Sequence, residues 1–243
     1  MNLVLTMAGK YSRFRSFGSK VPKYLLPLAT KTVLMEVISQ HLTSYPDLKV
    51  YLIANRSDQL FIPIIRAITE SFKLADIEII FIDDTFSQVE TAMLLTNFRH
   101  PPPLQEAICF ANIDTILINR EQYFKKLSNF SGSKIGFLDT FKGSSSQYSY
   151  CLIDEKNLIS HIAEKKVISD EACSGLYGFG TCELFMESAK KIIEKDNSAN
   201  FSDLYNYLIE MKVKVEALRS ENIANTIVLG TPEEYIKNIH RFR

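Results

Sequence analysis

Short apolar runs alternate with stretches of helical periodicity through the first half of the chain, and this alternation constrains the fold more than any other feature. The apolar runs span 2–6, 49–54, 77–82 and 106–111, and the helix-like stretches lie near 31–44, 57–73 and 88–98. Parallel strands are buried on both faces and need long crossover connections, which helices supply. The pattern therefore predicts an α/β fold with a mostly parallel sheet and helices on both of its faces.

The second half of the chain is patterned differently. Short strand-like segments are separated by polar turns, and they occupy 134–139, 148–153, 158–163 and 173–179. We expect these segments to add antiparallel strands at the edge of the sheet or over a pocket. Helices are predicted at 181–195, 202–211 and 231–239, with start signals at Thr181, at Ser202 and Asp203, and at Thr231 followed by Pro232.

Size and composition limit the classes of protein. The 243 residues fit one α/β domain, and 28 Lys and Arg balance 28 Asp and Glu. We therefore expect no nucleic-acid partner, since such proteins carry a basic domain or stripe. We see neither a run of about 18 apolar residues nor a secretory leader, so we expect a cytoplasmic protein with no membrane partner. The four cysteines form no Cys-x-x-Cys pair and are interpreted as reduced core thiols.

The segment Met7–Phe14 directly follows the first apolar strand, so its glycine turn lies at the carboxyl end of that strand. Ligands of open α/β sheets bind in the crevice outside such strand ends, where free backbone N–H groups receive anions. Arg13 adds a positive side chain, and Lys20 and Lys23 add two more in or beside the Pro22–Leu28 element. The turn and its cations together predict a phosphate site, whereas isolated loop cations are usually only solvated charges.

Asp114 follows the apolar run 106–111 by a few residues, at the same edge of the sheet as Gly9. Mg²⁺ is bound by one or two carboxylates together with phosphate oxygens and water, so one well-placed Asp can begin a metal site. The alternative interpretation is an Asp that forms the turn before Thr115.

These segments resemble the nucleotidyltransferases that join a nucleoside triphosphate to a sugar 1-phosphate or to a phosphorylated alcohol such as phosphocholine, a family found in surface polysaccharide pathways. The family's elements occur in its order over nearly the whole chain: the strand and glycine turn ending in Arg13, Pro22–Leu28, Phe110–Asp114, Ala163–Lys166, Ser174–Phe179 and Gly230–Tyr235. The resemblance implies a single Rossmann-like domain of the GT-A type. Its nucleotide-binding part would cover about 1–118 and its acceptor-binding part about 119–243.

The resemblance also implies roles for residues on the nucleotide side. Arg13 would grip the triphosphate and the pyrophosphate leaving group, Lys23 would contact the α-phosphate or the incoming phosphate, and Asp114 would bind Mg²⁺. The remaining nucleotide contacts would come from Met7, Ala8, Gly9, Tyr11, Ser12, Gln88 and Asn112.

On the acceptor side, the resemblance implies that Lys165 meets the acceptor phosphate and that Glu164 lies near the acceptor's polar groups. Gly175 would bring the backbone close to the acceptor, because only glycine lacks a Cβ there. The residues alone allow plainer interpretations: Glu164–Lys166 as a charged turn, and Gly175 as a β-bulge.

Three positions depart from the family's pattern. The family usually has a second glycine where Tyr11 stands, so either the nucleotide lies differently or the Tyr11 ring forms part of the pocket. Another glycine is usual near Gln88 and is absent here, so the sequence does not identify which nucleotide base would be bound. Many members carry a second metal-binding aspartate where this chain has Val228, and Asn225 or Glu221 would be the substitutes.

Two other functions remain as alternatives. A GT-A glycosyltransferase would use the acid near 114 to hold a metal on a nucleotide sugar, but it leaves Arg13 and Lys23 unexplained. A catalytically silent relative that only binds nucleotide or a partner would explain Val228 and the missing glycines. A homo-oligomer is left open by the sequence.

Overall fold

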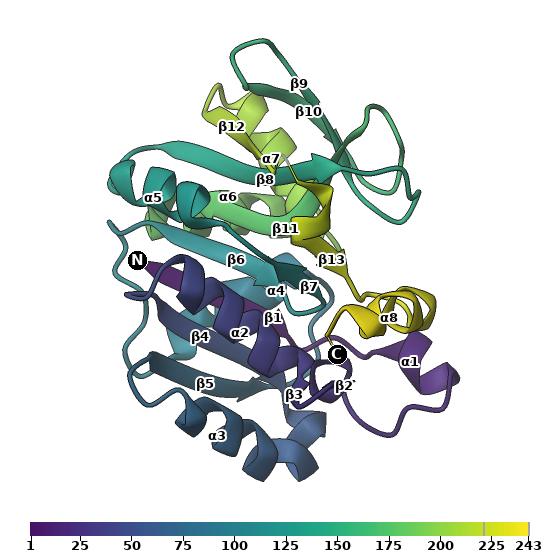
Figure 1. Cartoon of the computed structure of the whole chain (residues 1–243). Helices are drawn as coiled ribbons and strands as arrows, with labels where there is room; N and C mark the ends of the chain where they lie inside the picture. The colour runs from purple at the N-terminus through teal and green to yellow at the C-terminus, as the bar shows by residue number, and fades with distance from the viewer. Residues whose placement is uncertain (221, 243) are drawn as a thin grey trace.

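One large mixed sheet runs through the computed structural model of the chain, which describes residues 1–220 and 222–242 (Figure 1). Its strand order is β10-β9-β11-β6-β1-β4-β5, and β8 pairs with both β11 and β12. The strands of this sheet are β1 (Asn2–Met7), β4 (Lys49–Asn55), β5 (Asp76–Ile82), β6 (Ile108–Asn112), β8 (Ile135–Lys142), β9 (Tyr150–Ile153), β10 (Ile159–Ala163), β11 (Glu171–Phe179) and β12 (Lys214–Arg219). The predicted α/β fold with its mixed sheet is confirmed.

The strands β5, β4, β1 and β6 are parallel neighbours, so their carboxyl ends meet at one edge of the sheet. Thr6 near the end of β1 pairs with Ile53 of β4 on one side and with Asn112 of β6 on the other. This register places the glycine turn after β1 beside the segment after β6. The apolar runs of the first half predict this part of the fold because strands buried on both faces need such runs.

Antiparallel pairing begins at β11, which pairs with β6, β8 and β9, and β9 pairs with β10. The register of β11 against β8 shifts between Cys173 and Tyr177, so Gly175 lies in an irregular bulge. The elements that were not predicted include α5 (Glu121–Asn129) and β12, which pairs with β8 in parallel. Both α5 and β12 are short and carry many polar side chains, so their sequences alone predict them weakly. Tertiary contacts stabilise them, and in α5 these contacts bury Tyr123, Phe124 and Leu127.

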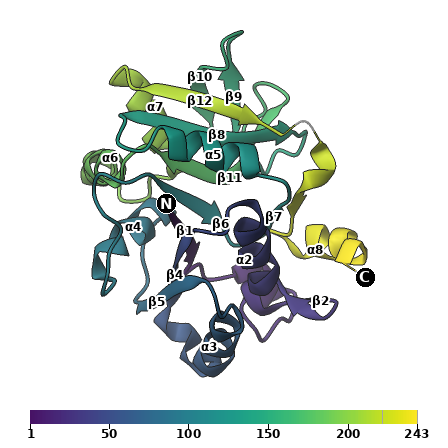
Figure 2. The same cartoon turned by 60° about the vertical axis from the view of Figure 1, so that its left-hand side comes forward.

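Helices cover both faces of the sheet (Figures 1 and 2). The helices are α1 (Ser12–Ser16), α2 (Val33–Ser44), α3 (Ile62–Ser71), α4 (Gln88–Met93), α5, α6 (Cys182–Lys195), α7 (Phe201–Glu210) and α8 (Pro232–Asn238). Residues of α2, α3 and α5 share one apolar core, and residues of α4, α6 and α7 share the other. The predicted caps Thr181 and Thr231 begin α6 and α8. Helix α7 begins one residue earlier than predicted, because Asn200 is its cap and its side chain accepts from Ser202 N and Asp203 N.

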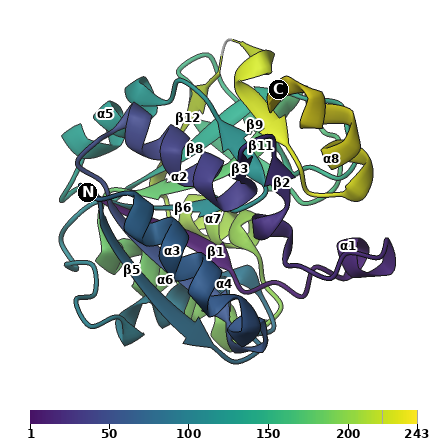
Figure 3. The same cartoon turned by 60° about the horizontal axis from the view of Figure 1, so that its bottom comes forward.

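Two small antiparallel ribbons lie outside the large sheet: β2 (Pro27–Leu28) with β3 (Lys31–Thr32), and β7 (Thr115–Leu117) with β13 (Thr226–Val228). The second ribbon brings the chain near residue 230 back to Asp114. From there α8 reaches the segment around α1 (Figure 3). The rings of Phe14 and Tyr235 pack edge to face at 6.3 Å, and Tyr235 Oη donates to the Pro27 carbonyl at 2.5 Å.

A buried ion pair joins β8 to the start of α5. Arg120 and Asp139 are almost completely buried, and Arg120 Nε lies 2.9 Å from Asp139 Oδ1. The guanidinium also donates to Thr226 Oγ1 at 2.6 Å, so it ties β13 to the same place. Among the described residues, no helix is both long enough and apolar enough to cross a membrane.

Candidate active site

Two cavities open at the carboxyl edge of the parallel strands. The β1-side cavity, of about 590 Å³, is lined by Thr6, Met7, Ala8, Gly9, Lys10, Tyr11, Lys23, Asp84, Thr85, Phe86, Ser87, Gln88, Thr91, Asn112, Ile113 and Asp114. The β11-side cavity, of about 210 Å³, is lined by Arg13, Gln88, Asn112, Asp114, Thr115, Gln147, Tyr148, Ser149, Glu164, Cys173, Ser174, Tyr177, Asn200, Phe201, Ser202, Val228, Gly230, Thr231 and Glu234. Most of the residues that the sequence predicts for a site thus line one of two adjoining spaces.

Tyr11 occupies the place where the resemblance leads one to expect a glycine. Its backbone is left-handed, with φ of 51°, a conformation that glycine adopts more readily. The hydroxyl donates to the Met7 carbonyl, and the ring packs edge to face on Tyr24 at 5.7 Å. Burial raises the pKa of Tyr11, so the hydroxyl stays protonated and keeps this bond. The backbone therefore makes the glycine-like turn, and the ring lines the cavity.

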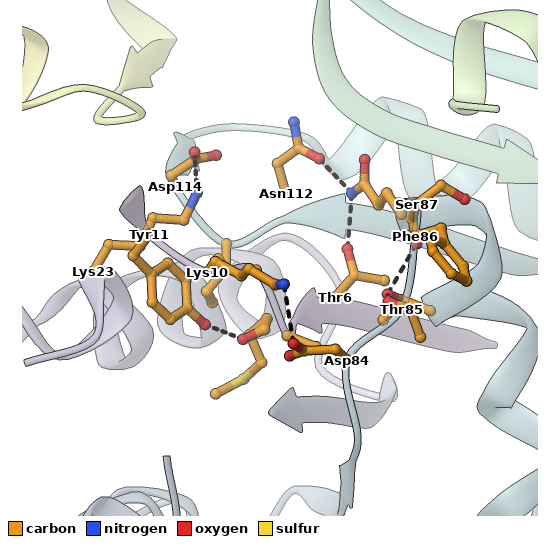
Figure 4. A pocket seen from close by; sticks show the side chains of 16 residues that line it. Thr6, Lys10, Tyr11, Lys23, Asp84, Thr85, Phe86, Ser87, Asn112 and Asp114 are labelled. Carbon is orange, nitrogen blue, oxygen red and sulfur yellow. Dashed lines mark hydrogen bonds and ion pairs between the residues drawn. The ribbon is translucent and has the colours of Figure 1, made fainter. Parts of the chain in front are cut away.

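The charged end of the β1-side cavity is the pair Lys23–Asp114 (Figure 4). Lys23 Nζ lies 2.5 Å from Asp114 Oδ2, and the two side chains are 21% and 18% exposed. Lys23 comes from a 3₁₀ turn that follows α1, and Asp114 from the turn between β6 and β7. A cation and a carboxylate from distant segments therefore meet at the end of the strands.

A second ion pair lies at the same cavity but nearer to solvent. Lys10 Nζ is 3.0 Å from Asp84 Oδ2, and Asn55 Nδ2 donates to Asp84 Oδ1 at 2.8 Å. The hydrogen bond from Asn55 and the Lys10 charge lower the pKa of Asp84, so its carboxylate is ionised at neutral pH. Beyond it, Thr85, Phe86 and Ser87 form the end of the cavity that lies away from Lys23 and Asp114 (Figure 4).

Carboxylates are the groups here that could hold a metal. A Cβ built on Gly230 would lie 3.1 Å from Asp114 Oδ2 and 3.4 Å from Glu234 Oε2, so the two carboxylates flank one point. Among the described residues, no three His, Cys, Asp or Glu side chains form a metal-binding group. Any Mg²⁺ bound here would therefore take most of its ligands from phosphate and water.

Arg13 and Ser12 lie elsewhere than the nucleotide-side role suggests. Arg13 lines the β11-side cavity, where its Nη2 donates to Gln147 Oε1 at 3.2 Å. Ser12 begins α1 and is not among the residues that line either cavity. Two side chains of α1 contact the second half of the chain, since Arg13 donates to Gln147 and the Phe14 ring packs on Tyr235.

The acceptor-side residues are separated by the structure. Glu164 lines the β11-side cavity and accepts hydrogen bonds from Ser149 Oγ and, at 3.0 Å, from Ser202 Oγ. Lys165 is not among the lining residues; its exposed ammonium lies 3.6 Å from Glu164 Oε1. Gly175 has φ of 89° and is not among the residues that line either cavity. Its neighbour is Asn112 and not the acceptor space, since a Cβ on Gly175 would lie 2.3 Å from Asn112 Nδ2.

Sequence reasoning missed Glu234 and Asp84. In the sequence, Glu234 is already explained as a helix-capping residue. Its Oε2 accepts from Thr231 N at 3.0 Å and completes the capping box of α8. Burial and the Glu234 carboxylate raise the pKa of Tyr148, which therefore donates to Glu234 Oε1 at 3.2 Å. Asp84 did carry a signal: it follows a predicted strand at the same sheet edge as Asp114. Of the substitutes considered for Val228, Asn225 lies beside Arg120, and Glu221 is outside the described residues.

No family model matches the chain, and no curated protein matches its sequence. Solved structures do match over the whole fold. A nucleoside-diphosphate-sugar pyrophosphorylase from Vibrio cholerae RC9 has a TM-score of 0.82 at 21% identity, over 99% of this chain and all of that one. A Bacillus anthracis protein provisionally named a glucose-1-phosphate thymidylyltransferase, solved with a sucrose, has a TM-score of 0.81 at 14% identity, over 100% of this chain and 95% of that one.

A UDP-glucose pyrophosphorylase complexed with UDP-glucose has a TM-score of 0.78 at 13% identity, over 99% of this chain and 97% of that one. At these sequence identities, the similarity shows that the chains share the same backbone fold. The chain therefore has the fold of the sugar-nucleotide pyrophosphorylases, with its two cavities at the carboxyl edge of the parallel strands.

Proposed function

We propose that the protein is a nucleotidyltransferase that transfers a nucleoside monophosphate from a nucleoside triphosphate to a sugar 1-phosphate and releases pyrophosphate. One observation carries the proposal: two cavities meet at Gln88, Asn112 and Asp114, which line both of them. An enzyme that joins two phosphorylated molecules needs such a meeting point. The fold of the pyrophosphorylases supports the same reaction.

The nucleotide fits the β1-side cavity in one direction. Its phosphates belong at the Lys23–Asp114 end, together with the backbone N–H groups of the Gly9 turn. Its base then lies at the other end, beside Phe86 (Figure 4). In this arrangement Met7, Ala8, Gly9 and Tyr11 form the floor of the nucleotide site, and the part of the chain over about 1–118 binds the nucleotide.

The residues around Asp114 have distinct tasks in the transfer. Lys23 neutralises a phosphate oxygen as charge develops, and Arg13 reaches the phosphates from the second cavity. Mg²⁺ held by Asp114 and the phosphates would supply further charge neutralisation when bound. The acceptor phosphate oxygen attacks the α-phosphorus, and the bond to the leaving pyrophosphate breaks with its electron pair on pyrophosphate.

The β11-side cavity suits a sugar phosphate better than phosphocholine. Its wall carries hydroxyl and carboxylate groups, among them Ser149, Ser202 and Glu164, which match the hydroxyls of a sugar. A quaternary ammonium is bound by open aromatic faces. The rings of Tyr177 and Phe201 are buried and stack on each other at 4.4 Å, which leaves the half-buried Tyr148 as the one other ring among the described lining residues. Lys165 would approach the acceptor phosphate from outside this wall.

A matrix of the four ribonucleoside triphosphates and dTTP against several sugar 1-phosphates and phosphocholine tests the proposal. We expect Mg²⁺-dependent release of pyrophosphate with at least one sugar 1-phosphate. A glycosyltransferase would instead release a nucleoside diphosphate from a nucleotide sugar, and a silent relative would bind nucleotide without turnover. Either result would overturn the proposal. These substrates suit a cytoplasmic enzyme that supplies nucleotide sugars, for example to surface polysaccharides.

A further inference from the structure

The junction of the two cavities is made by one carboxylate and two amides. Asp114, Gln88 and Asn112 each line both spaces. If the proposed function is correct, the phosphorus–oxygen bond forms at this junction, because each substrate fills one cavity. The transfer step gives no task to the side-chain amides of Gln88 and Asn112, although both lie where the bond would form.

Gln88 fixes the orientation of Asn112. Gln88 Nε2 donates one hydrogen to Thr6 Oγ1 and the other to Asn112 Oδ1, each at 2.7 Å. The oxygen end of the Asn112 amide is therefore occupied. Within residues 1–220 and 222–242, Asn112 Nδ2 has no hydrogen-bond acceptor, which leaves two N–H donors at the junction.

Gly175 supports the same amide from behind. Its backbone has φ of 89°, and a Cβ on it would lie 2.3 Å from Asn112 Nδ2 and 2.7 Å from Asn112 Cγ. Only a residue without a side chain lets the Asn112 amide occupy this place. The amide is thus held between Gln88 and the bulge of β11, as a preorganised donor has to be.

We infer that Asn112 is a catalytic residue whose Nδ2 donates a hydrogen bond to a non-bridging oxygen of the phosphoryl group in transfer. As the acceptor oxygen bonds to the α-phosphorus and pyrophosphate leaves with the electron pair of the broken bond, negative charge spreads over these oxygens. A neutral donor held at the junction stabilises that charge and undergoes no protonation change. Gln88 and Gly175 are positioning residues, since they act through Asn112.

Asn112→Ala tests this role by separating rate from binding. We expect the single-turnover rate to fall roughly 10- to 100-fold, the loss of one hydrogen bond to a charged group. The dissociation constants of the triphosphate and of the sugar phosphate, measured by calorimetry, should change by less than about threefold. Asn129→Ala, an exposed amide on α5, is the matched control and should keep the wild-type rate. An unchanged rate, or a loss explained by weaker nucleotide binding, would overturn the inference.

A double-mutant cycle with Gly175→Ala gives an independent readout. In the wild-type background the new methyl group displaces the Asn112 amide. In the Asn112→Ala background the amide is gone, and only a 3.0 Å contact with the Cβ of residue 112 and the backbone strain remain. We expect Gly175→Ala to lower the rate clearly less in the Asn112→Ala background than in the wild-type background, with melting temperatures recorded for all four proteins. Additive losses would overturn the inference. A wild-type protein that neither binds nucleoside triphosphates nor releases pyrophosphate would overturn the proposed function as well.

Discussion

The two cavities differ in how the chain builds them. The β1-side cavity is made from turns that directly follow β1, β5 and β6, so its residues are placed by parallel strands in register. The β11-side cavity draws its wall from segments between Arg13 and Glu234, and side chains rather than strand ends define it. A nucleotide site can thus follow largely from sheet topology, with Lys23 added from the turn after α1, whereas the acceptor site depends on how loops and late helices pack. If the two cavities also differ in function, a substitution in one of them should leave the ligand of the other unaffected.

Asp114→Asn should have the largest effect, because Asp114 lines both cavities. Removing its charge weakens the proposed metal contact and leaves Lys23 without its partner at 2.5 Å. We expect the initial rate to fall roughly 10²- to 10³-fold, as for loss of one key electrostatic group. Asp84→Asn, at the edge of the β1-side cavity only, is the control and should affect nucleotide use alone. A near-wild-type rate for Asp114→Asn at limiting Mg²⁺ would remove Asp114 from its proposed role.

Phe86→Ala should affect the β1-side cavity alone. The ring is 76% exposed at the end of the cavity away from Lys23, where it can stack on a base. Base stacking is worth about 1–3 kcal/mol, so nucleoside triphosphate binding should weaken roughly 5- to 150-fold. Tripolyphosphate, which has no base, should bind both proteins equally in calorimetry. Leu60→Ala, also exposed, controls for loss of surface apolar area. Equal weakening for tripolyphosphate would place the base elsewhere.

Arg13→Lys should slow the reaction although the positive charge is kept. The planar guanidinium can bind two phosphate oxygens at once, and lysine cannot reproduce that geometry. We expect the rate to fall about tenfold, the size of one charge-assisted hydrogen bond, with the melting temperature unchanged. Gln147→Ala removes the partner of Arg13 and should cost much less. If both variants lose the same rate, the Arg13–Gln147 contact itself is what matters.

Lys165→Ala should affect only the acceptor. The ammonium is exposed and outside the cavity wall, so we expect acceptor use to weaken by about tenfold, the lower end for a hydrogen bond to a charged group. Nucleotide affinity should not change. Calorimetric titration of each ligand checks both statements, and Lys166→Ala is the neighbouring control. Weaker nucleotide binding with intact acceptor binding would reassign Lys165 to the other cavity.

His41→Leu should leave both cavities unchanged and alter stability alone. Burial, with the Arg120 charge, lowers the pKa of His41 to about 3, and neither ring nitrogen has a partner in the described part of the chain. The folded state therefore keeps His41 neutral, while the unfolded chain takes up a proton below about pH 6.5. Between pH 7 and pH 5 the wild type should lose about 2 kcal/mol of unfolding free energy through this residue, and the variant should not. Urea unfolding at both pH values measures the difference; parallel losses would contradict it.

Sequence reasoning predicted the parallel half of the fold because strand and helix periodicities there are strong and uninterrupted. It also placed Gly9, Lys23 and Asp114 at one sheet edge, and the structure brings them to one cavity. It missed β12 and α5, which are held by packing rather than by pattern. It could not locate Arg13, since the direction of α1 depends on the left-handed turn at Tyr11. Glu234 escaped notice because a capping box accounts for a glutamate at that position.

The contact of α8 with the segment around α1 also bears on folding. The hydrogen bond from Tyr235 to Pro27 joins residues 208 positions apart, and the ribbon of β13 with β7 closes a separation about half as long. Contacts of such length form slowly, because the intervening chain loses much freedom when its ends meet. The parallel pairs β1–β4 and β4–β5 join much nearer segments of the chain. During synthesis, the loop that carries Lys23 therefore gains its last support only after nearly the whole chain has been made.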